Sequence, residues 1–321
     1  MNKRKLGTYH VSAVGLGCMP MSGFPPDRAH MLGKRDQAIA TIHAALDAGV
    51  TLLDTADIYS PTWNTMGHNE FLVAEAFRTW NGSAQDKDSV VIATKGGITR
   101  GPGGDWFGTG GRNASEHYLY RAVEASAARL GRAKIQLWQH HRLDPSTSFE
   151  KQFLNVMKLK EHGYVENIGL SNITLSQLER AVNIGGSPEQ GGIVSVQNEY
   201  SPRYRHGEDV RTRCEELGIT FLPWSPLGGI GNGDKLASGN YGRFDQIAAK
   251  YKISAYALTI AWHLATSKVT IPIPGATRPE SILDTLKGAE ITLTADDLAV
   301  LHESLPTLGQ IHPELVDVRE L

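Results

Sequence analysis

"VTLLDTADIY", residues 50–59, begins as an apolar strand and ends in polar and ionisable side chains. The run VTLLD has the continuous apolar pattern of a strand buried on both faces, as in a parallel sheet. Asp54, Asp57 and Tyr59 follow within a few residues. In a barrel of parallel strands and helices, active sites are built where the strands end. This stretch therefore predicts both the fold and the edge at which its chemistry lies.

Short apolar runs of this kind recur along the chain, and most are followed by a segment with helical spacing. The runs span residues 11–17, 50–54, 89–95, 134–139, 165–171, 192–197, 219–224 and 268–275. DQAIATIHAALDAG (36–49) and SEHYLYRAVEASAARLG (115–131) illustrate the helical segments, because apolar residues recur on one face and a glycine follows. Ser115 is expected to cap the second of these helices.

Repeated strand–helix units in a chain of 321 residues without a Pro/Ser linker favour one (β/α)₈ TIM barrel over residues 1–321 rather than two domains. Such a barrel takes about 250 residues. We expect the residues beyond this number to form an N-terminal hairpin in KRKLGTYHVSAV (3–14), long strand-end loops at 96–114 and near 228–243, and a C-terminal helix from about Thr294.

The alternative fold is a doubly wound sheet, which would need a glycine-rich turn leading directly into a helix after the first strand. GLGCMPMSG (15–23) has the glycines, but no helical pattern follows it directly. No acidic residue closes a second strand at the expected spacing either. The barrel is therefore the favoured architecture.

Composition narrows the possible partners. The net charge of −2 gives no basic surplus for binding nucleic acid or an anionic membrane. Cys18 and Cys214 are the only cysteines and lack metal-ligand spacing, which indicates a reducing compartment and no metal. No apolar segment follows the charged first residues, and no run approaches the ~20 residues that a membrane span requires. We expect a cytoplasmic protein, and nothing in the sequence indicates its oligomeric state.

Polar or aromatic groups stand at the ends of consecutive predicted strands. They are Asp54 with Tyr59, Lys95, His140–His141, Ser171–Asn172, Gln197–Asn198, Trp224–Ser225 and the turn at 275–278. Each has an ordinary explanation by itself, such as helix capping or turn formation. Because the strand ends of a barrel share one rim, together they predict a site.

Asp54, Tyr59, Lys95 and a histidine are suited to reducing a carbonyl with hydride from another source. A lysine ammonium favours phenolate and so lowers the pKa of a nearby phenol, and Asp54 would keep Lys95 protonated. Such a phenol can protonate an oxygen on which negative charge develops, and a histidine can hydrogen-bond that oxygen. Neighbours on a strand face opposite ways, so only one of His140 and His141 can enter the site, which argues against a two-histidine metal site.

The chain resembles the aldo-keto reductases over nearly its whole length. The motifs that carry the resemblance are GVTLLDTADIY (49–59), VVIATKGG (90–97), LWQHHRLD (137–144), YVENIGLSN (164–172), VQNEYSP (196–202), LPWSPLGGI (222–230) and IPIPGATRPESI (271–282). The resemblance implies a (β/α)₈ barrel that binds NADP(H) without a Rossmann domain and reduces a small aldehyde or ketone to the alcohol. It implies Tyr59 as the general acid, supported by Asp54 and Lys95. It places His141 at the family's catalytic histidine, and His140 in the core.

The resemblance also implies the cofactor contacts. They are Gly17, Cys18, Met19, Asp54, Ser171, Asn172, Gln197, Trp224, Ser225, Leu227, Gly229, Gly275, Arg278, Ser281 and Thr285. Ser171, Asn172 and Gln197 would hold the nicotinamide carboxamide, and Trp224 would stack on its ring. Ser281 stands where the family often has a second basic residue near the adenosine 2′-phosphate, so a weaker preference for NADPH over NADH is expected.

Substrate contacts are expected from Tyr59, His141, Trp63 and Trp106, with apolar walls to which Phe24 would also contribute. Trp106 lies in the glycine-rich loop GGITRGPGGDWFGTGGRNAS (96–115). A phosphate cradle in this loop would need a Gly-Lys-Ser/Thr ending that is absent, so a mobile substrate lid is the favoured interpretation.

Two other functions remain to be compared with carbonyl reduction. An aldolase-type barrel would use Lys95 as a Schiff-base nucleophile, which needs a depressed lysine pKa, whereas Asp54 alongside would raise it. A regulatory subunit could retain the cofactor site without turnover. The complete Asp-Tyr-Lys-His set argues against this second alternative.

Overall fold

Seven parallel strands form one curled sheet in the computed structural model, which describes residues 1–23, 30–101, 111–229 and 243–305. Each strand pairs with the next in the chain. The strands are β3 (Leu16–Gly17), β4 (Leu52–Asp54), β5 (Val91–Gly96), β6 (Ile135–His140), β7 (Val165–Ser171), β8 (Ser195–Gln197) and β9 (Thr220–Phe221).

Residues 268–275 occupy the eighth position, between β9 and β3, and close the sheet into a barrel. The N–H of Ile271 donates to the carbonyl of Phe221 at 2.8 Å, and a parallel bridge joins Phe221 to this segment. On the other side, the carbonyls of Pro272 and Pro274 accept hydrogen bonds from β3 residues at 2.9 and 3.0 Å. Proline has no N–H to donate in return. The eighth predicted strand is therefore in place but too sparsely bonded to form a regular strand.

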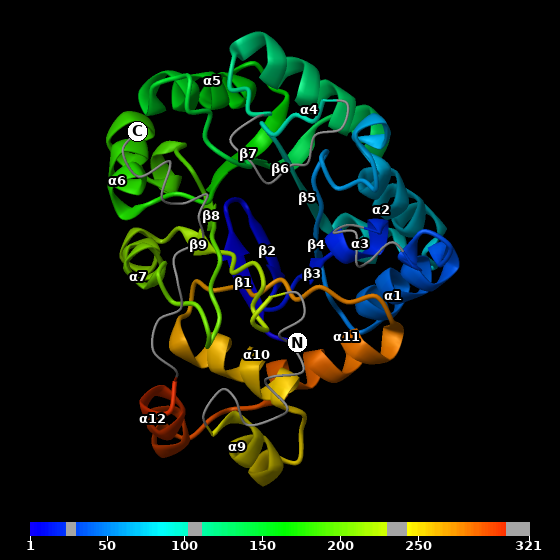
Figure 1. Cartoon of the computed structure of the whole chain (residues 1–321), viewed down its shortest axis with the longest axis vertical. Helices are drawn as coiled ribbons and strands as arrows, with labels where there is room; N and C mark the ends of the chain where they lie inside the picture. Colours follow the sequence, from blue (N-terminus) through cyan, green and yellow to red (C-terminus); the bar gives the residue numbers. More distant parts are fainter. Residues whose placement is uncertain (24–29, 102–110, 230–242, 306–321) are drawn as a thin grey trace.

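The expected N-terminal hairpin is confirmed and plugs one end of the barrel. Strands β1 (Lys3–Leu6) and β2 (Tyr9–Ser12) pair antiparallel, and Figure 1 shows them inside the ring of parallel strands. The Thr220 hydroxyl, at the start of β9, donates to the Lys5 carbonyl at 2.7 Å. Leu6 and Val11 are buried among inward-facing apolar residues of the barrel strands. Because the hairpin fills the end where the strands begin, the site can open only where they end.

The first predicted strand, 11–17, is the one run that the structure divides. Its start belongs to the hairpin, where the N–H of Ala13 donates to the Asn2 carbonyl at 2.9 Å. Only β3 at its end joins the barrel. Within this run the chain passes from the N-terminal hairpin to the parallel sheet of the barrel. The run therefore does not form a single straight strand, even though most of its residues are apolar.

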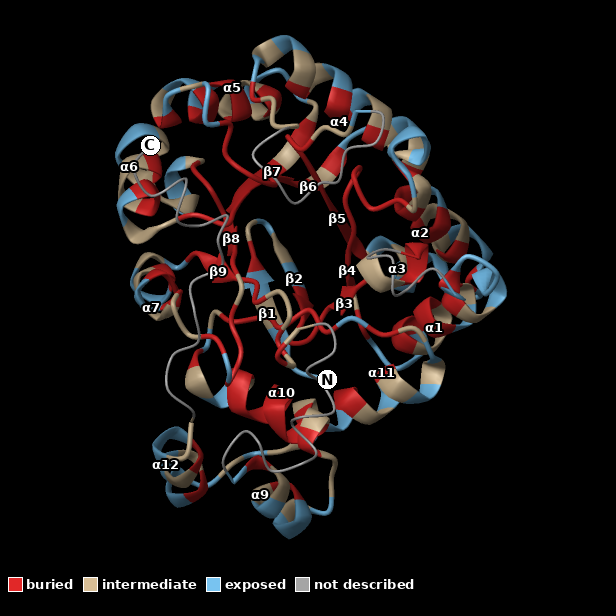
Figure 2. Cartoon of the chain, viewed as in Figure 1, coloured by how far each residue is buried: buried red, intermediate tan, exposed pale blue. Residues whose placement is uncertain are grey.

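Helices surround the barrel, with their buried faces toward the strands (Figure 2). They are α1 (Arg35–Asp47), α2 (His68–Thr79), α4 (Glu116–Leu130), α5 (Phe149–Glu161), α6 (Leu175–Gly185), α7 (Glu208–Leu217), α10 (Ala255–Thr266) and α11 (Pro279–Leu286). Helix α9 (Phe244–Tyr251) packs outside this ring against α10, and α12 (Ala295–Glu303) packs against α9. The short helix α3 (Ala84–Asp88) has no buried residue. As predicted, Ser115 caps α4, Gly131 ends it at φ 63°, and a helix, α12, begins after Thr294 as the last helix of the described residues. Within the described ranges, none of these helices is long and apolar enough to cross a membrane.

Candidate active site

Three ionisable side chains meet where β4 and β5 end. Lys95 is 0% exposed, and its Nζ donates to Asp54 Oδ1 at 2.6 Å, to the Thr55 carbonyl at 2.8 Å and to the Tyr59 hydroxyl at 3.1 Å. A buried ammonium is tolerated only when paired and hydrogen-bonded, because burial removes its hydration. These acceptors match its three N–H donors. The lysine is therefore held in one position against the phenol.

The loop after β4 is tied down on two sides, which fixes Tyr59. The N–H of Asp57 donates to the Lys95 carbonyl at 3.1 Å, and the Tyr59 carbonyl accepts from the N–H of Asn69, in α2, at 3.1 Å. Burial raises the pKa of Asp57 well above its usual range. Burial therefore favours the neutral form of this carboxyl over a second anion near Lys95. Tyr59 itself packs against Ile98 in a small apolar cluster.

The net effect on the phenol differs from the sequence-based expectation. Burial raises the pKa of Tyr59 by more than the neighbouring Lys95 lowers it, so the pKa is raised overall. For Lys95, burial by itself lowers the pKa, but the charges of Asp54 and Tyr59 raise it above its ordinary value. At neutral pH the site therefore contains a phenol and an ammonium. A lysine held in its charged form is not the nucleophile that an aldolase needs.

His141 faces the same phenol from the end of β6. Its ring stands edge-on to the Tyr59 ring, with 5.6 Å between centroids and an interplanar angle of 83°. Burial, reinforced by the charge of Lys95 and others, lowers the pKa of His141 well below its ordinary value, so the imidazole is neutral. His140 turns the other way, stacks on Trp138 and shares a hydrogen bond of 3.1 Å with Gln152. The two histidines alternate as expected for strand neighbours.

The ends of β7, β8 and β9 are joined to this centre by hydrogen bonds. Asn172 Nδ2 donates to Ser171 Oγ at 2.8 Å and to the His141 carbonyl at 3.0 Å. Trp224 Nε1 donates to Asn172 Oδ1 at 3.0 Å. Asn172 has φ 60°, a left-handed conformation that asparagine tolerates better than most residues. The polar groups predicted at these strand ends therefore lie together.

Gln197 makes a contact that the sequence did not indicate. Its Nε2 donates to Asp54 Oδ2 at 2.8 Å, while Asp54 Oδ1 accepts from Lys95. One carboxylate thus joins residues from three strands. This hydrogen bond forms because the Gln197 side chain points toward Asp54 at the end of its strand. The spacing of residues in a motif does not specify that direction.

The remaining predicted cofactor residues lie along the same rim. A Cβ at Gly17 would come within 2.8 Å of the Ile273 carbonyl, so the closing segment requires a glycine there. Cys18 is fully buried, and burial raises the pKa of its thiol, as expected for a packed cysteine. Ser225 has φ 51° and Gly229 has φ 89° in the loop after β9. Met19 and Leu227 are partly buried, against the Tyr59 cluster and the main core respectively.

The predicted phosphate-binding residues stand around the start of α11. A Cβ at Gly275 would come within 2.8 Å of Pro20. Arg278 is the N-cap residue, its side chain is 61% exposed, and its Nε lies 3.5 Å from Glu280 Oε1. Ser281 and Thr285 are bonded to each other within the helix, the Thr285 hydroxyl donating to the Ser281 carbonyl at 2.8 Å. Arg278 is thus the residue of this group that extends into solvent.

Of the predicted substrate contacts, Tyr59 and His141 lie together, as described above. Trp63 belongs to a short 3₁₀ turn, Trp63–Thr65, and is 43% exposed on the loop that carries Tyr59. Trp106 and Phe24 lie outside the described residues.

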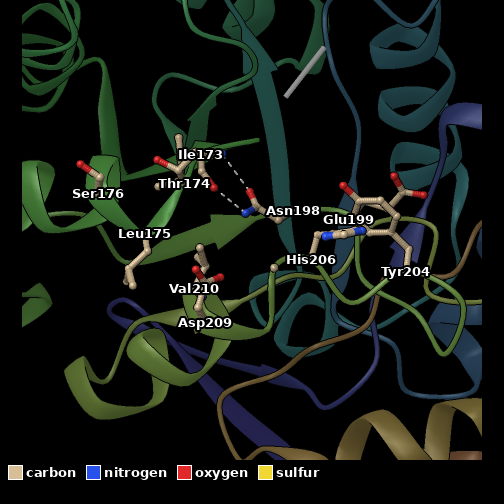
Figure 3. A pocket seen from close by; sticks show the side chains of 11 residues that line it. Ile173, Thr174, Leu175, Ser176, Asn198, Glu199, Tyr204, His206, Asp209 and Val210 are labelled. Carbon is tan, nitrogen blue, oxygen red and sulfur yellow. Dashed lines mark hydrogen bonds between the residues drawn. The ribbon is translucent and has the colours of Figure 1, made fainter. Parts of the chain in front are cut away.

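A cavity of about 450 Å³ lies beside the site, between the N-terminal ends of α6 and α7 (Figure 3). Its walls include Glu199, Tyr204, His206 and Asp209. Burial raises the pKa of Glu199 to about 7. Glu199 was not singled out from the sequence; the signal available was its place two positions after Gln197 in VQNEYSP (196–202), the spacing of residues on one face of a strand.

Comparisons with known proteins agree with this geometry. The model of the aldo/keto reductase family matches residues 30–305. The chain is 30% identical over 308 residues to an uncharacterized oxidoreductase of Schizosaccharomyces pombe, covering 93% of this chain and 88% of that protein. It is 29% identical over 330 residues to a probable aldo-keto reductase of Glycine max, covering 94% and 88%. An aldo-keto reductase of Klebsiella pneumoniae, solved in complex with NADPH, superposes with a TM-score of 0.76 at 21% identity, covering 98% of each chain.

Proposed function

Because this chain belongs to the aldo/keto reductase family, we propose that it reduces an aldehyde or ketone to the alcohol with NADPH, using Tyr59 as the general acid. The observation that carries the proposal is the buried Lys95, whose ammonium contacts both Asp54 and the Tyr59 hydroxyl. Tyr59 and His141 together face the space in which a carbonyl oxygen would be protonated.

The residues present suit the nicotinamide cofactor. Within the described parts of the chain Gln197 Oε1 accepts no hydrogen bond, so it can accept one from a carboxamide N–H. Trp224 offers an aromatic face held by Asn172. Arg278, at the N-terminus of α11, suits a phosphate because both the guanidinium and the helix end favour an anion. When bound, the reduced cofactor would supply the hydride.

The chain's own residues would carry the proton. As the carbonyl oxygen gains negative charge, Tyr59 donates its phenolic proton to that oxygen. The resulting phenolate is stabilised by the Lys95 ammonium, 3.1 Å from the Tyr59 oxygen. Asp54 and Gln197 keep the ammonium in place. The neutral His141 would orient the substrate by a hydrogen bond to the same oxygen. The raised pKa of Tyr59 keeps the proton on the phenol until charge develops on the substrate.

Oxidation of NADPH with a panel of aliphatic, aromatic, sugar and pyridoxal-type carbonyls tests the proposal. We expect turnover with at least one class and its loss in Tyr59→Phe. Tyr120→Phe, on the outer helix α4, is the matched control and should behave as the parent. If the protein binds NADPH but turns over none of these carbonyls, it is a cofactor-binding subunit rather than a reductase. An adduct trapped on Lys95 by borohydride would instead indicate an aldolase-type reaction.

A further inference from the structure

Asn172 stands where the chain leaves β7 toward α6, in a backbone conformation that needs support. Its φ is 60°, in the left-handed region. A residue with a side chain adopts this conformation at a cost and keeps it only when its surroundings hold it there. Because the direction of a side chain follows the backbone conformation, whatever fixes the backbone of Asn172 also fixes its amide.

The amide of Asn172 connects three neighbouring strand ends. Its Nδ2 donates to Ser171 Oγ at 2.8 Å and to the His141 carbonyl at 3.0 Å, and its Oδ1 accepts from Trp224 Nε1 at 3.0 Å. Ser171 is an expected contact of the nicotinamide carboxamide, and Trp224 is the expected aromatic face for the nicotinamide ring. His141 is the expected partner of the carbonyl oxygen. A different backbone conformation at Asn172 would therefore disturb both the cofactor side and the substrate side of the site.

On the β7 side, the main chain of β8 anchors Asn172. Ser171 Oγ donates to the Gln197 carbonyl at 2.7 Å, and the N–H of Asn172 donates to the same carbonyl at 3.0 Å. Gln197 is the last residue of β8, and its pairing with Ser171 is the last of the ladder. The regular ladder therefore ends before Ile173, the residue that follows Asn172.

Asn198 continues this ladder by one residue with its side chain. Asn198 Oδ1 accepts from the N–H of Ile173 at 3.1 Å, and Asn198 Nδ2 donates to the Ile173 carbonyl at 2.8 Å (Figure 3). A carboxamide carries a donor and an acceptor side by side, so one side chain bonds both backbone groups of a buried residue that need partners. Asn198 is itself 4% exposed, and its carbonyl accepts from the N–H of Trp224 at 3.0 Å. The anchor is thus fixed on its own side as well.

We propose that Asn198 is a positioning residue for the nicotinamide, because its amide holds Ile173 and so keeps Asn172 in the left-handed conformation. In that conformation the Asn172 side chain orders Ser171 and Trp224. The side-chain bonds of Asn198 run to Ile173, so it acts through this neighbour rather than by touching the cofactor. The inference rests on the proposed NADPH-dependent reduction and adds a residue to that same site.

The test compares the binding of NADPH with that of 2′-phospho-ADP-ribose, which shares the adenosine and its phosphates but lacks the nicotinamide. Asn198→Leu nearly keeps the shape of the side chain and removes both the donor and the acceptor. We expect it to weaken NADPH binding about three- to tenfold, the range for a lost hydrogen bond, and to leave binding of the fragment unchanged. With a carbonyl that the parent reduces, kcat should fall about ten- to a hundredfold, as expected when reacting groups are misplaced. A purely structural role would change both affinities or neither.

A matched control is available in β7 itself. Asn167 is 2% exposed near the start of that strand, and its Nδ2 donates to the Gln136 carbonyl at 3.0 Å. Asn167→Leu should therefore lower stability while keeping the parent affinities for both ligands. Asn198→Ser is the milder variant, because Asn198 lines the cavity and water can enter the space that serine leaves. It should show a smaller loss with the same selectivity for NADPH, and it keeps the comparison measurable if Asn198→Leu does not fold.

A double-variant cycle then tests whether the effect passes through Asn172. Glycine adopts a positive φ without strain, and Asn172→Gly also removes the side chain that Asn198 is proposed to position. In the Asn172→Gly background, Asn198→Leu should cause little further loss of NADPH affinity, whereas independent effects would add.

The outcomes separate the inference from the proposed function. Additive losses in the cycle, or an unchanged ratio of the two affinities in both Asn198 variants, overturn the inference and leave the proposed function intact. A parent protein that binds NADPH but reduces no carbonyl refutes the proposed reduction, while the binding comparison still decides the role of Asn198. A parent protein that does not bind NADPH overturns both.

Discussion

The buried pair of Asp54 and Lys95 and the exposed Arg278 are both charged groups of the candidate site, but their surroundings differ. The pair stands at strand ends, is excluded from solvent and balances its own charge. Arg278 stands at the start of α11, where its side chain is 61% exposed. A balanced buried pair can position a proton donor without attracting an ion, whereas an exposed cation at a helix start can bind an anion. The difference suggests that the strand ends determine the reaction and the start of α11 determines which dinucleotide is bound.

Tyr59→Phe is the change that should damage the buried centre most. Removing the phenolic proton should lower kcat by about 10²- to 10⁴-fold, the usual contribution of a general acid. NADPH binding, followed by quenching of its fluorescence, should be nearly unchanged because the phenol faces the substrate. A kcat within a few-fold of the parent would mean that Tyr59 is not the acid.

Lys95→Met should cost stability as well as activity, because it leaves Asp54 buried without its cation. Breaking a buried pair by removing one partner costs about 3–5 kcal/mol. We therefore expect a lower midpoint in urea denaturation and a large loss of kcat.

The double variant Asp54→Asn/Lys95→Met separates these two effects. It removes both charges, so it should regain much of the lost stability while remaining inactive. Recovery of activity in the double variant would show that the pair serves only the fold. Arg121→Met, which removes only an exposed ion pair on α4, should affect stability less than Lys95→Met.

The contrast between these regions also explains what the sequence could predict. The strand ends were predictable because an apolar run followed by a polar residue marks where a barrel strand stops, and Asp54, Lys95 and His141 are placed that way. The bond from Gln197 to Asp54 depends on side-chain direction, which spacing does not encode. The direction of the Tyr59 pKa shift was wrong because the sequence shows Lys95 but not the depth of burial.

Regions outside regular strands were harder to predict. The closing segment 268–275 was correctly predicted as an apolar run. That Pro272 and Pro274 leave this segment with few hydrogen bonds to its neighbours could be recognised only when the neighbouring strands were in place.

Arg278, the exposed cation of this comparison, is expected to meet a cofactor phosphate at the start of α11. Arg278→Ala should raise KM for NADPH by roughly tenfold to a hundredfold, since hydrogen bonds to charged groups contribute about 1.5–3 kcal/mol. KM for NADH should be almost unchanged, because NADH lacks the 2′-phosphate. Equal increases for both cofactors would assign Arg278 to the fold or to the shared part of the dinucleotide.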